Sequence, residues 1–276
     1  MKLGANEGIF KCFGDNRYKM MKKYGFDYAD YVLDGVLGDK TEEEYEAMVL
    51  AEKALADEAG VTIHQIHGHW RWLPHDETEA LREERAEWMR RSIRLGAKIG
   101  CKNWVIHPMM PFGPSSDDFM LDEFMRINFE FFRNLLPYAK EHDVTICFEN
   151  MPMTRFSLAT PQRILEFVRQ MNDDHFKICL DTGHVSVFPE LSLPDETRAL
   201  GDEIRVLHVH DNNFGRDAHM FPYFGIIDWK PFGKALKDIG FNGSFSIETR
   251  PPEQLPDHIY EKFAIALRET AEWIVE

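Results

Sequence analysis

Short apolar runs rich in β-branched or aromatic residues alternate along this chain with longer segments that carry an apolar residue every three or four positions. Such alternation is typical of repeated βα units built around a parallel sheet. We therefore expect strands at eight places. Six are clear, at 61–67, 103–107, 144–149, 176–181, 204–210 and 244–248, and two weaker ones precede them, at 2–6 and 26–32.

The segments between these runs have helical periodicity, and no Pro-, Gly- or Ser-rich linker divides the chain. An α/β fold, specifically a single (β/α)8 TIM barrel, accounts best for eight strands with helices between them. We interpret residues 1–276 as one barrel domain. The expected helices cover 42–58, 79–99, 118–139, 161–171, 230–239 and 257–274.

Side-chain size alternates within the expected strands, as a barrel requires. Small residues such as Cys147, Cys179 and Ser246 share a strand face with the polar residue that ends each strand. Bulky residues such as Phe148 and Trp104 occupy the opposite face. This asymmetry predicts a narrow interior on one side of the sheet and a ring of helices on the other.

The six clear strands all finish on a residue type that can bind a metal. Parallel strands of a barrel point the same way, so their carboxyl ends meet at one mouth. One acid at a strand end is usually a helix cap, but several carboxylates buried together are unfavourable unless a cation or protons compensate. The pattern therefore predicts a divalent metal site formed among His67, His107, Glu149, Asp181, His208 and Glu248.

Carboxylate and imidazole ligands together suit Mn²⁺, Mg²⁺, Co²⁺, Fe²⁺ or Zn²⁺. The four cysteines are scattered without the spacing of a closed structural zinc site, and we interpret them as buried reduced thiols. No dinucleotide fingerprint, P-loop or GxSxG motif is present.

Charge argues against some partners. The 32 basic and 47 acidic residues give a formal net charge of −15, which repels phosphate backbones and anionic lipid surfaces. We therefore expect a small-molecule partner rather than nucleic acid or a membrane. The N-terminus has too short an apolar run for a signal peptide, so a cytoplasmic location is expected.

Four runs together carry a family resemblance: CFENMP (147–152), LDTGH (180–184), LHVHDN (207–212) and SIET (246–249). They resemble the xylose isomerase-like TIM-barrel superfamily, which includes sugar-phosphate isomerases and epimerases, inosose dehydratases and endonuclease IV. The resemblance implies a central metal site formed by Glu149, Asp181, His208 and Glu248. His208 is preferred over His210 because an acid, Asp211, follows it three residues later, but both histidines share a strand face and either can reach the ion.

Further residues match outer positions of the same superfamily. His184 resembles a residue that contacts substrate in keto-sugar epimerases or an additional zinc in endonuclease IV. Asp217 and His219 have the spacing of that outer zinc site, although a polar loop is the simpler interpretation. With His67 and His107 included, the resemblance extends to a three-metal site, so we expect one to three ions per chain.

Three residues are candidates for substrate binding near the mouth. Trp70 can form an apolar wall for a sugar, although aromatic loop residues more often cover the rim of a barrel. Arg216 and Arg250 can bind a phosphate or carboxylate, although exposed arginines are commonly only solvated.

The resemblance implies a metal-dependent isomerase or epimerase of a small polyhydroxylated carbonyl compound, either a sugar or a sugar phosphate. Glu149 and Glu248 would act as the acid/base pair around an enediolate. An endonuclease IV-like phosphodiesterase and an inosose-type dehydratase are the alternative enzymes, and a non-catalytic sugar-binding barrel is the remaining class. Barrels of this type commonly pair, so a homo-oligomer is one candidate assembly, and the sequence leaves the oligomeric state open.

Overall fold

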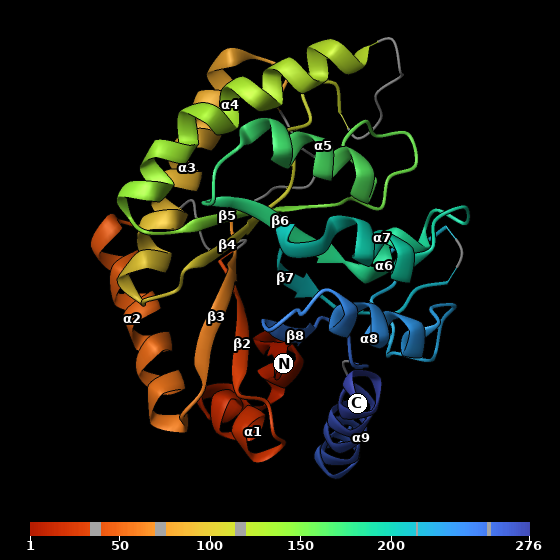
Figure 1. Cartoon of the computed structure of the whole chain (residues 1–276). Coiled ribbons are helices and arrows are strands. Elements are labelled where there is room, and N and C mark those ends of the chain that lie inside the picture. The colour runs from red at the N-terminus through yellow and green to blue at the C-terminus, as the bar shows by residue number, and fades with distance from the viewer. Residues whose placement is uncertain (34–39, 70–75, 114–119, 214, 253–254) are drawn as a thin grey trace.

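The computed structural model describes the chain except residues 34–39, 70–75, 114–119, 214 and 253–254. Its centre is an eight-stranded parallel sheet in the order β7-β6-β5-β4-β3-β2-β1-β8 that curls into a nearly closed barrel (Figure 1). The predicted (β/α)8 fold is confirmed. The strands are β1 (Lys2–Asn6), β2 (Tyr28–Val32), β3 (Thr62–His67), β4 (Asn103–Ile106), β5 (Thr145–Glu149), β6 (Phe176–Asp181), β7 (Ile204–His208) and β8 (Ser244–Ile247).

Closure between β7 and β8 rests on a single residue. Val209, one position past the end of β7, forms an isolated parallel bridge with Ile247. Its amide donates to the carbonyl of Ser246 at 2.8 Å, and its carbonyl accepts from the amide of Glu248 at 2.9 Å. The segment expected as a strand over 204–210 therefore ends at His208, because Val209 leaves the β6 ladder to meet β8.

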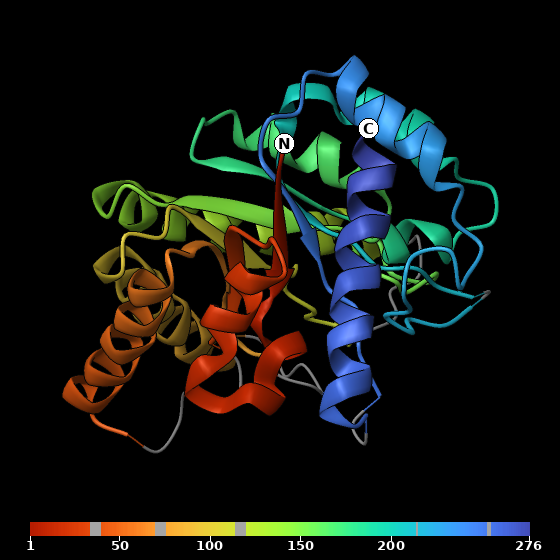
Figure 2. The same cartoon turned by 90° about the horizontal axis from the view of Figure 1, so that it is seen from below.

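Helices surround the barrel, as Figures 1 and 2 show from two directions. Every helix predicted from the sequence is present among the described residues, with ends that differ by a few positions. The α-helices are α1 (Arg17–Lys23), α2 (Glu42–Ala59), α3 (Glu79–Lys98), α4 (Leu121–Glu141), α5 (Pro161–Met171), α6 (Thr182–Ser186), α7 (Leu193–Leu200), α8 (Trp229–Asp238) and α9 (Asp257–Val275), and the 3-10 helices η1 (Glu7–Asn16) and η3 (Gly201–Glu203) accompany them.

Local signals in the sequence set the helix ends. Thr41 and Glu44 form a capping box at the start of α2, and Gly60 ends that helix in a left-handed conformation. Thr160 caps α5, whose first residue is Pro161. These caps fix where each loop leaves the barrel, and hence where the strand-end side chains project.

The inside and outside of the barrel have different packing. Val105, Cys147, Cys179 and Val206 form a small buried cluster of their own inside the barrel. Large residues on the opposite strand faces, such as Trp104 and Phe148, belong to the main core under the helices. The predicted alternation of small and bulky faces is therefore confirmed. No helix in the described part of the chain is long and apolar enough to cross a membrane.

Candidate metal centre

The carboxyl ends of six strands bring the predicted ligands together at one mouth. His67, Glu149, Asp181 and His208 are the last residues of β3, β5, β6 and β7. His107 and Glu248 follow β4 and β8 by one position. All are buried except Glu248, whose side chain is 21% exposed. The resulting site is a set of three adjacent clusters, and Glu149 belongs to the first two.

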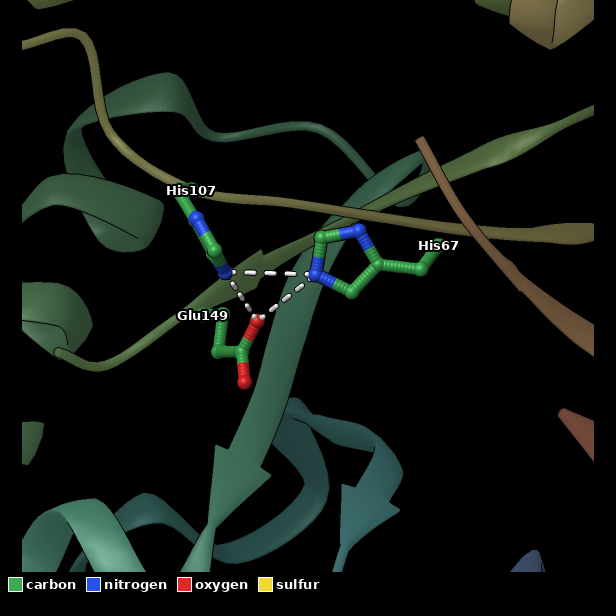
Figure 3. A group of neighbouring side chains, drawn as sticks. All are labelled: His67, His107 and Glu149. Carbon is green, nitrogen blue, oxygen red and sulfur yellow. Dashed lines mark hydrogen bonds and ion pairs between the residues drawn. The ribbon is translucent and has the colours of Figure 1, made fainter. Parts of the chain in front are cut away.

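The first cluster is a triangle of ligand atoms (Figure 3). Glu149 Oε2 lies 3.0 Å from His107 Nε2 and 3.5 Å from His67 Nε2, and the two Nε2 atoms lie 3.2 Å apart. Zinc–nitrogen bonds of about 2.0–2.1 Å in a tetrahedral arrangement place ligand atoms roughly 3.3 Å apart. The triangle has the dimensions of three ligands around one small cation.

The ring orientation of His67 supports the same interpretation. Its Nδ1 atom lies 2.9 Å from the carbonyl oxygen of Gly68, which can only accept, so Nδ1 carries the proton. Nε2 then presents its lone pair to His107 and Glu149. A histidine anchored in this way by a carbonyl is the usual arrangement of a metal ligand.

Glu149 joins the first cluster to a central one. Its other oxygen, Oε1, lies 2.8 Å from His208 Nδ1, and Glu248 Oε2 lies 3.3 Å from the same nitrogen. Asp181 completes the central cluster, because Asp181, His208 and Glu248 each place one ligand atom within 4.8 Å of the others. These four residues are the ones that the family resemblance assigns to the central metal.

His210 also reaches this region, so the structure keeps both histidines of LHVHDN in contact with the acids. His210 Nε2 lies 3.0 Å from Asp181 Oδ2. The ring packs over Gly183, where a Cβ atom would lie 2.0 Å from His210 Cε1, so the glycine in LDTGH makes room for this histidine. Asp181 has a second task, because its Oδ1 accepts the amide of His184 at 2.7 Å and caps α6.

The outer cluster consists of His184, Asp217 and His219. His184 Nε2 lies 3.6 Å and His219 Nε2 lies 3.3 Å from Asp217 Oδ2. Each ring is anchored through Nδ1, His184 to the carbonyl of Asn150 at 2.7 Å and His219 to that of Glu248 at 2.9 Å. His219 holds a left-handed backbone, φ 45°, and its carbonyl accepts from the Arg250 amide. Strain of this kind is concentrated at functional sites.

The pKa values of the buried acids and histidines at this site are shifted by burial and by one another's charges. Burial opposes ionisation of Glu149, yet His208 and His107 hold its pKa well below the usual range. Burial likewise disfavours the imidazolium of His184, but Asp181 and Asp217 outweigh it and raise its pKa to about 10. Burial lowers the pKa of His107 to about 4, so its ring stays neutral at pH 7.

These residues fit a divalent cation. Glu149 Oε2, inside the triangle, has no hydrogen-bond donor with good geometry, although it is fully buried. Glu149 and Asp181 are buried carboxylates at one mouth. Among the described residues, the basic groups that lie within ligand distance of them are histidine side chains rather than Lys or Arg. A shared cation compensates such a set better than protons do, and oxygen with imidazole ligation is the donor chemistry that Mn²⁺, Co²⁺ and Zn²⁺ accept.

Two supporting residues were missed by reasoning from the sequence. Asn150 donates to the carbonyl of Asp181 and accepts from its amide, at 3.0 and 2.8 Å, and so holds β5 against β6 at the site. Asp30, inside the barrel on β2, lies 3.2 Å from His208 Nε2. Its position in FDYADYV, an acid within an apolar strand, was the signal that would have identified it.

A pocket of about 230 Å³ opens over the clusters. Val32, Met110 and Met151 give it an apolar wall opposite the acids and histidines. Arg250 lines it, whereas Arg216 is exposed and lines none of the pockets found at the mouth. Trp70, the third predicted substrate contact, lies outside the described residues.

Comparisons with curated proteins identify sugar-modifying relatives. The chain is 31% identical over 117 residues to a D-psicose 3-epimerase of Enterocloster bolteae, which covers 42% of this chain and 37% of that protein. It is 30% identical over 133 residues to a mannonate dehydratase of Oceanobacillus iheyensis, with the same two coverages. Alignments with the curated relatives span between 37% and 63% of their lengths.

Solved structures share the complete fold. A D-tagatose 3-epimerase-like protein superposes with a TM-score of 0.80 at 22% identity, covering 100% of this chain and 98% of the other. The family model for the xylose isomerase-like TIM barrel matches residues 18–270. The chain therefore belongs to the xylose isomerase-like TIM-barrel family.

Proposed function

We propose that this protein is a divalent-metal-dependent epimerase or isomerase of a small polyhydroxylated carbonyl compound. The observation that supports the proposal best is the pair of carboxylates, Glu149 and Glu248, that line one pocket and both face the Nδ1 atom of His208. Two carboxylates at one carbon suit removal of a proton by one group and its return by the other. The sugar epimerases among the relatives support the same reaction class.

Glu149, Asp181, His208 and Glu248 would hold the central cation, which supplies a Lewis acid that polarises the carbonyl and its neighbouring hydroxyl. The chain's own residues then do the proton chemistry. Glu149 is a carboxylate at neutral pH, because its pKa is held well below the usual range, and it is ready to accept the proton next to the carbonyl. Glu248, on the more exposed side, returns a proton to the enediolate from the opposite direction.

The pocket walls favour this chemistry over side reactions. Met110, Met151 and Val32 exclude water from one side of the reacting carbon. Burial lowers the pKa of His107 to about 4, so its ring carries no imidazolium proton that it could donate to the intermediate at neutral pH.

Solvent exchange tests the proposal. Ketoses, inososes and sugar phosphates are incubated in D₂O with the Mn²⁺-loaded protein and followed by NMR. We expect deuterium at the carbon beside the carbonyl and formation of the epimer or isomer, with both lost in E149Q and E248Q. Retention of all protium during turnover would contradict the two-carboxylate mechanism. A product that has lost water instead would identify a dehydratase, the activity of one curated relative.

A second function has one specific observation in its favour. The three clusters, with His184, Asp217 and His219 as the outermost, contain all the ligand positions that the resemblance to endonuclease IV implies. The net charge of −15 opposes binding to DNA. A nicking assay on a duplex with one abasic site separates the two, and we expect no cleavage by the metal-loaded protein.

A further inference from the structure

A second pocket adjoins the metal centre. It has a volume of about 660 Å³, compared with about 230 Å³ for the pocket over the clusters. The two share Val32, His219, Glu248 and Arg250 in their walls, so they lie next to each other at the mouth of the barrel. Pockets for small organic ligands usually measure about 300–1,000 Å³. A substrate whose carbonyl end lies over the clusters therefore has its natural extension in the second pocket.

Two cations line this second pocket without partners. Lys11 comes from η1, just after β1, and Arg250 follows β8. Neither side chain has a hydrogen bond or an ion pair with any other described residue. By contrast, Arg85, the other cation in the wall of the first pocket, is held by Asp76 at 2.7 Å. The two cations thus remain available to a ligand, in a chain whose overall charge repels anions.

A third polar group lines the same pocket. Tyr260 is only 3% exposed, and its hydroxyl has no hydrogen-bond partner in the described structure. Such a hydroxyl is costly to bury unless a ligand or water completes it. Among the described residues of the wall, Glu248 is the only acid, and it lies at the edge shared with the first pocket. The far side of the pocket therefore offers donors and positive charge.

We propose that this pocket, which we call the distal pocket, binds an anionic group at the end of the substrate remote from its carbonyl. The inference rests on the proposed function and deepens it: the substrate is a polyhydroxylated carbonyl compound that carries a phosphate or a carboxylate. Lys11 and Arg250 neutralise the anion, and the Tyr260 hydroxyl donates to it. Charge-assisted hydrogen bonds of this kind are about twice as strong as neutral ones.

Binding is tested first without turnover. Cys12 lines the distal pocket and is the exposed one of the four cysteines, since Cys101, Cys147 and Cys179 are buried. The rate of its alkylation by iodoacetamide is measured with rising inorganic phosphate at constant ionic strength. We expect phosphate to protect Cys12 in the wild type at least about tenfold more effectively than in K11A or R250A. K262A, which removes an exposed lysine of α9 that lines neither pocket, should behave as the wild type.

Turnover then identifies the anion. Solvent exchange is compared for a neutral ketohexose, its 6-phosphate and a ketohexuronate, with the Mn²⁺-loaded protein. We expect kcat/KM at least about tenfold higher for one anionic substrate than for the neutral one, with most of that preference lost in K11A and in R250A and kept in K262A. The substrate that shows it distinguishes phosphate from carboxylate.

The outcomes separate the two proposals. Equal kcat/KM for neutral and anionic substrates, or a preference that survives in K11A and R250A, overturns the distal pocket while leaving the epimerase intact. Absence of exchange with every substrate contradicts the proposed function. In that case the protection of Cys12 decides the pocket alone: protection that both variants lose supports it, and no protection by phosphate overturns it.

Discussion

Asp30 Oδ2 lies 3.2 Å from His208 Nε2, on the ring nitrogen opposite the one that faces Glu149 and Glu248. The carboxylate is 1% exposed and comes from β2, across the barrel interior. A carboxylate behind a histidine ligand fixes the tautomer of the ring and raises its basicity. The barrel interior thus supports the metal centre from below.

We therefore expect D30A to weaken Mn²⁺ binding about 10- to 100-fold, because His208 loses the carboxylate that faces its Nε2 atom. D30N keeps the size of the side chain while removing the charge, so a similar loss in D30N would show that the charge is what matters. Calorimetric titration of the metal-free variants measures both. Wild-type affinity in D30A would show that Asp30 has no part in the metal centre.

The triangle of His67, His107 and Glu149 predicts a metal content above one ion per chain. H107A should lose one bound ion and keep the central one, because the central ligands remain. E149Q should reduce binding at both, since Glu149 faces the first cluster through Oε2 and the central cluster through Oε1. Elemental analysis of the Mn²⁺- or Zn²⁺-loaded proteins gives the counts. Equal metal content in wild type and H107A would exclude the triangle as a metal site.

Two aspartates of the same loop should behave differently. Asp211 accepts the amides of Tyr223 and Ile227 and the indole N–H of Trp229, at 2.9, 3.2 and 2.9 Å. Among the described residues, Asp217 forms its ion pairs with His184, His210 and His219. D211A should lower the free energy of unfolding by at least about 3 kcal/mol, because several buried donors lose a charged acceptor.

The matched variant D217A should lower the stability of the metal-free protein less than D211A does, because the Asp217 side chain is 32% exposed, and it should also lower the metal content. Urea unfolding and elemental analysis of both variants separate the two roles. A large loss of stability in D217A together with unchanged metal content would mean that the outer cluster is an ordinary polar loop.

The raised pKa of Glu7 predicts that the stability of the protein depends on pH in a way that does not involve the metal. Burial raises its pKa to about 7 from an ordinary value near 4.5, against the opposing influence of Arg17. Between these two values the folded chain keeps a proton that the unfolded chain has lost. The contribution of Glu7 is therefore fully present below about pH 4.5 and is lost as the pH rises through about 7.

E7Q removes this titration. Relative to the wild type, its free energy of unfolding should rise by up to about 3 kcal/mol between pH 4.5 and pH 8, as the shift of the pKa implies. Urea unfolding of both proteins at several pH values measures the difference, and other titrating groups cancel in it. A difference that is constant with pH would refute the raised pKa.

The ligands at strand ends could be predicted because a parallel barrel leaves only one place for them. His67, Glu149 and Asp181 end the clear strands β3, β5 and β6, so the direction of the sheet alone brings them to the same mouth. The small side chains on the interior faces of β5 and β6 could also be predicted, because the alternation of side chains along a strand is a local property of the sequence.

Other parts of the site depend on geometry that one sequence does not carry. An acid within an apolar strand marks Asp30 in the sequence, but the strand pattern does not say that it faces His208 of β7 across the barrel. His210 was expected on the strand, but the β7 ladder ends at His208 and the Thr182 hydroxyl accepts its amide instead. Lys11 joins the distal pocket only because η1 folds back over the mouth beside the β8 loop.

The one-residue bridge at Val209 has a mechanical consequence. This bridge is the shortest strand pairing in the barrel. It lies between His208 and Glu248, two groups that a central ion would bind together. An ion bound there would link β7 to β8, so its removal should weaken the contact between these two strands before any other contact in the barrel. Amide hydrogen exchange at Val209 and Glu248 would then report metal occupancy directly.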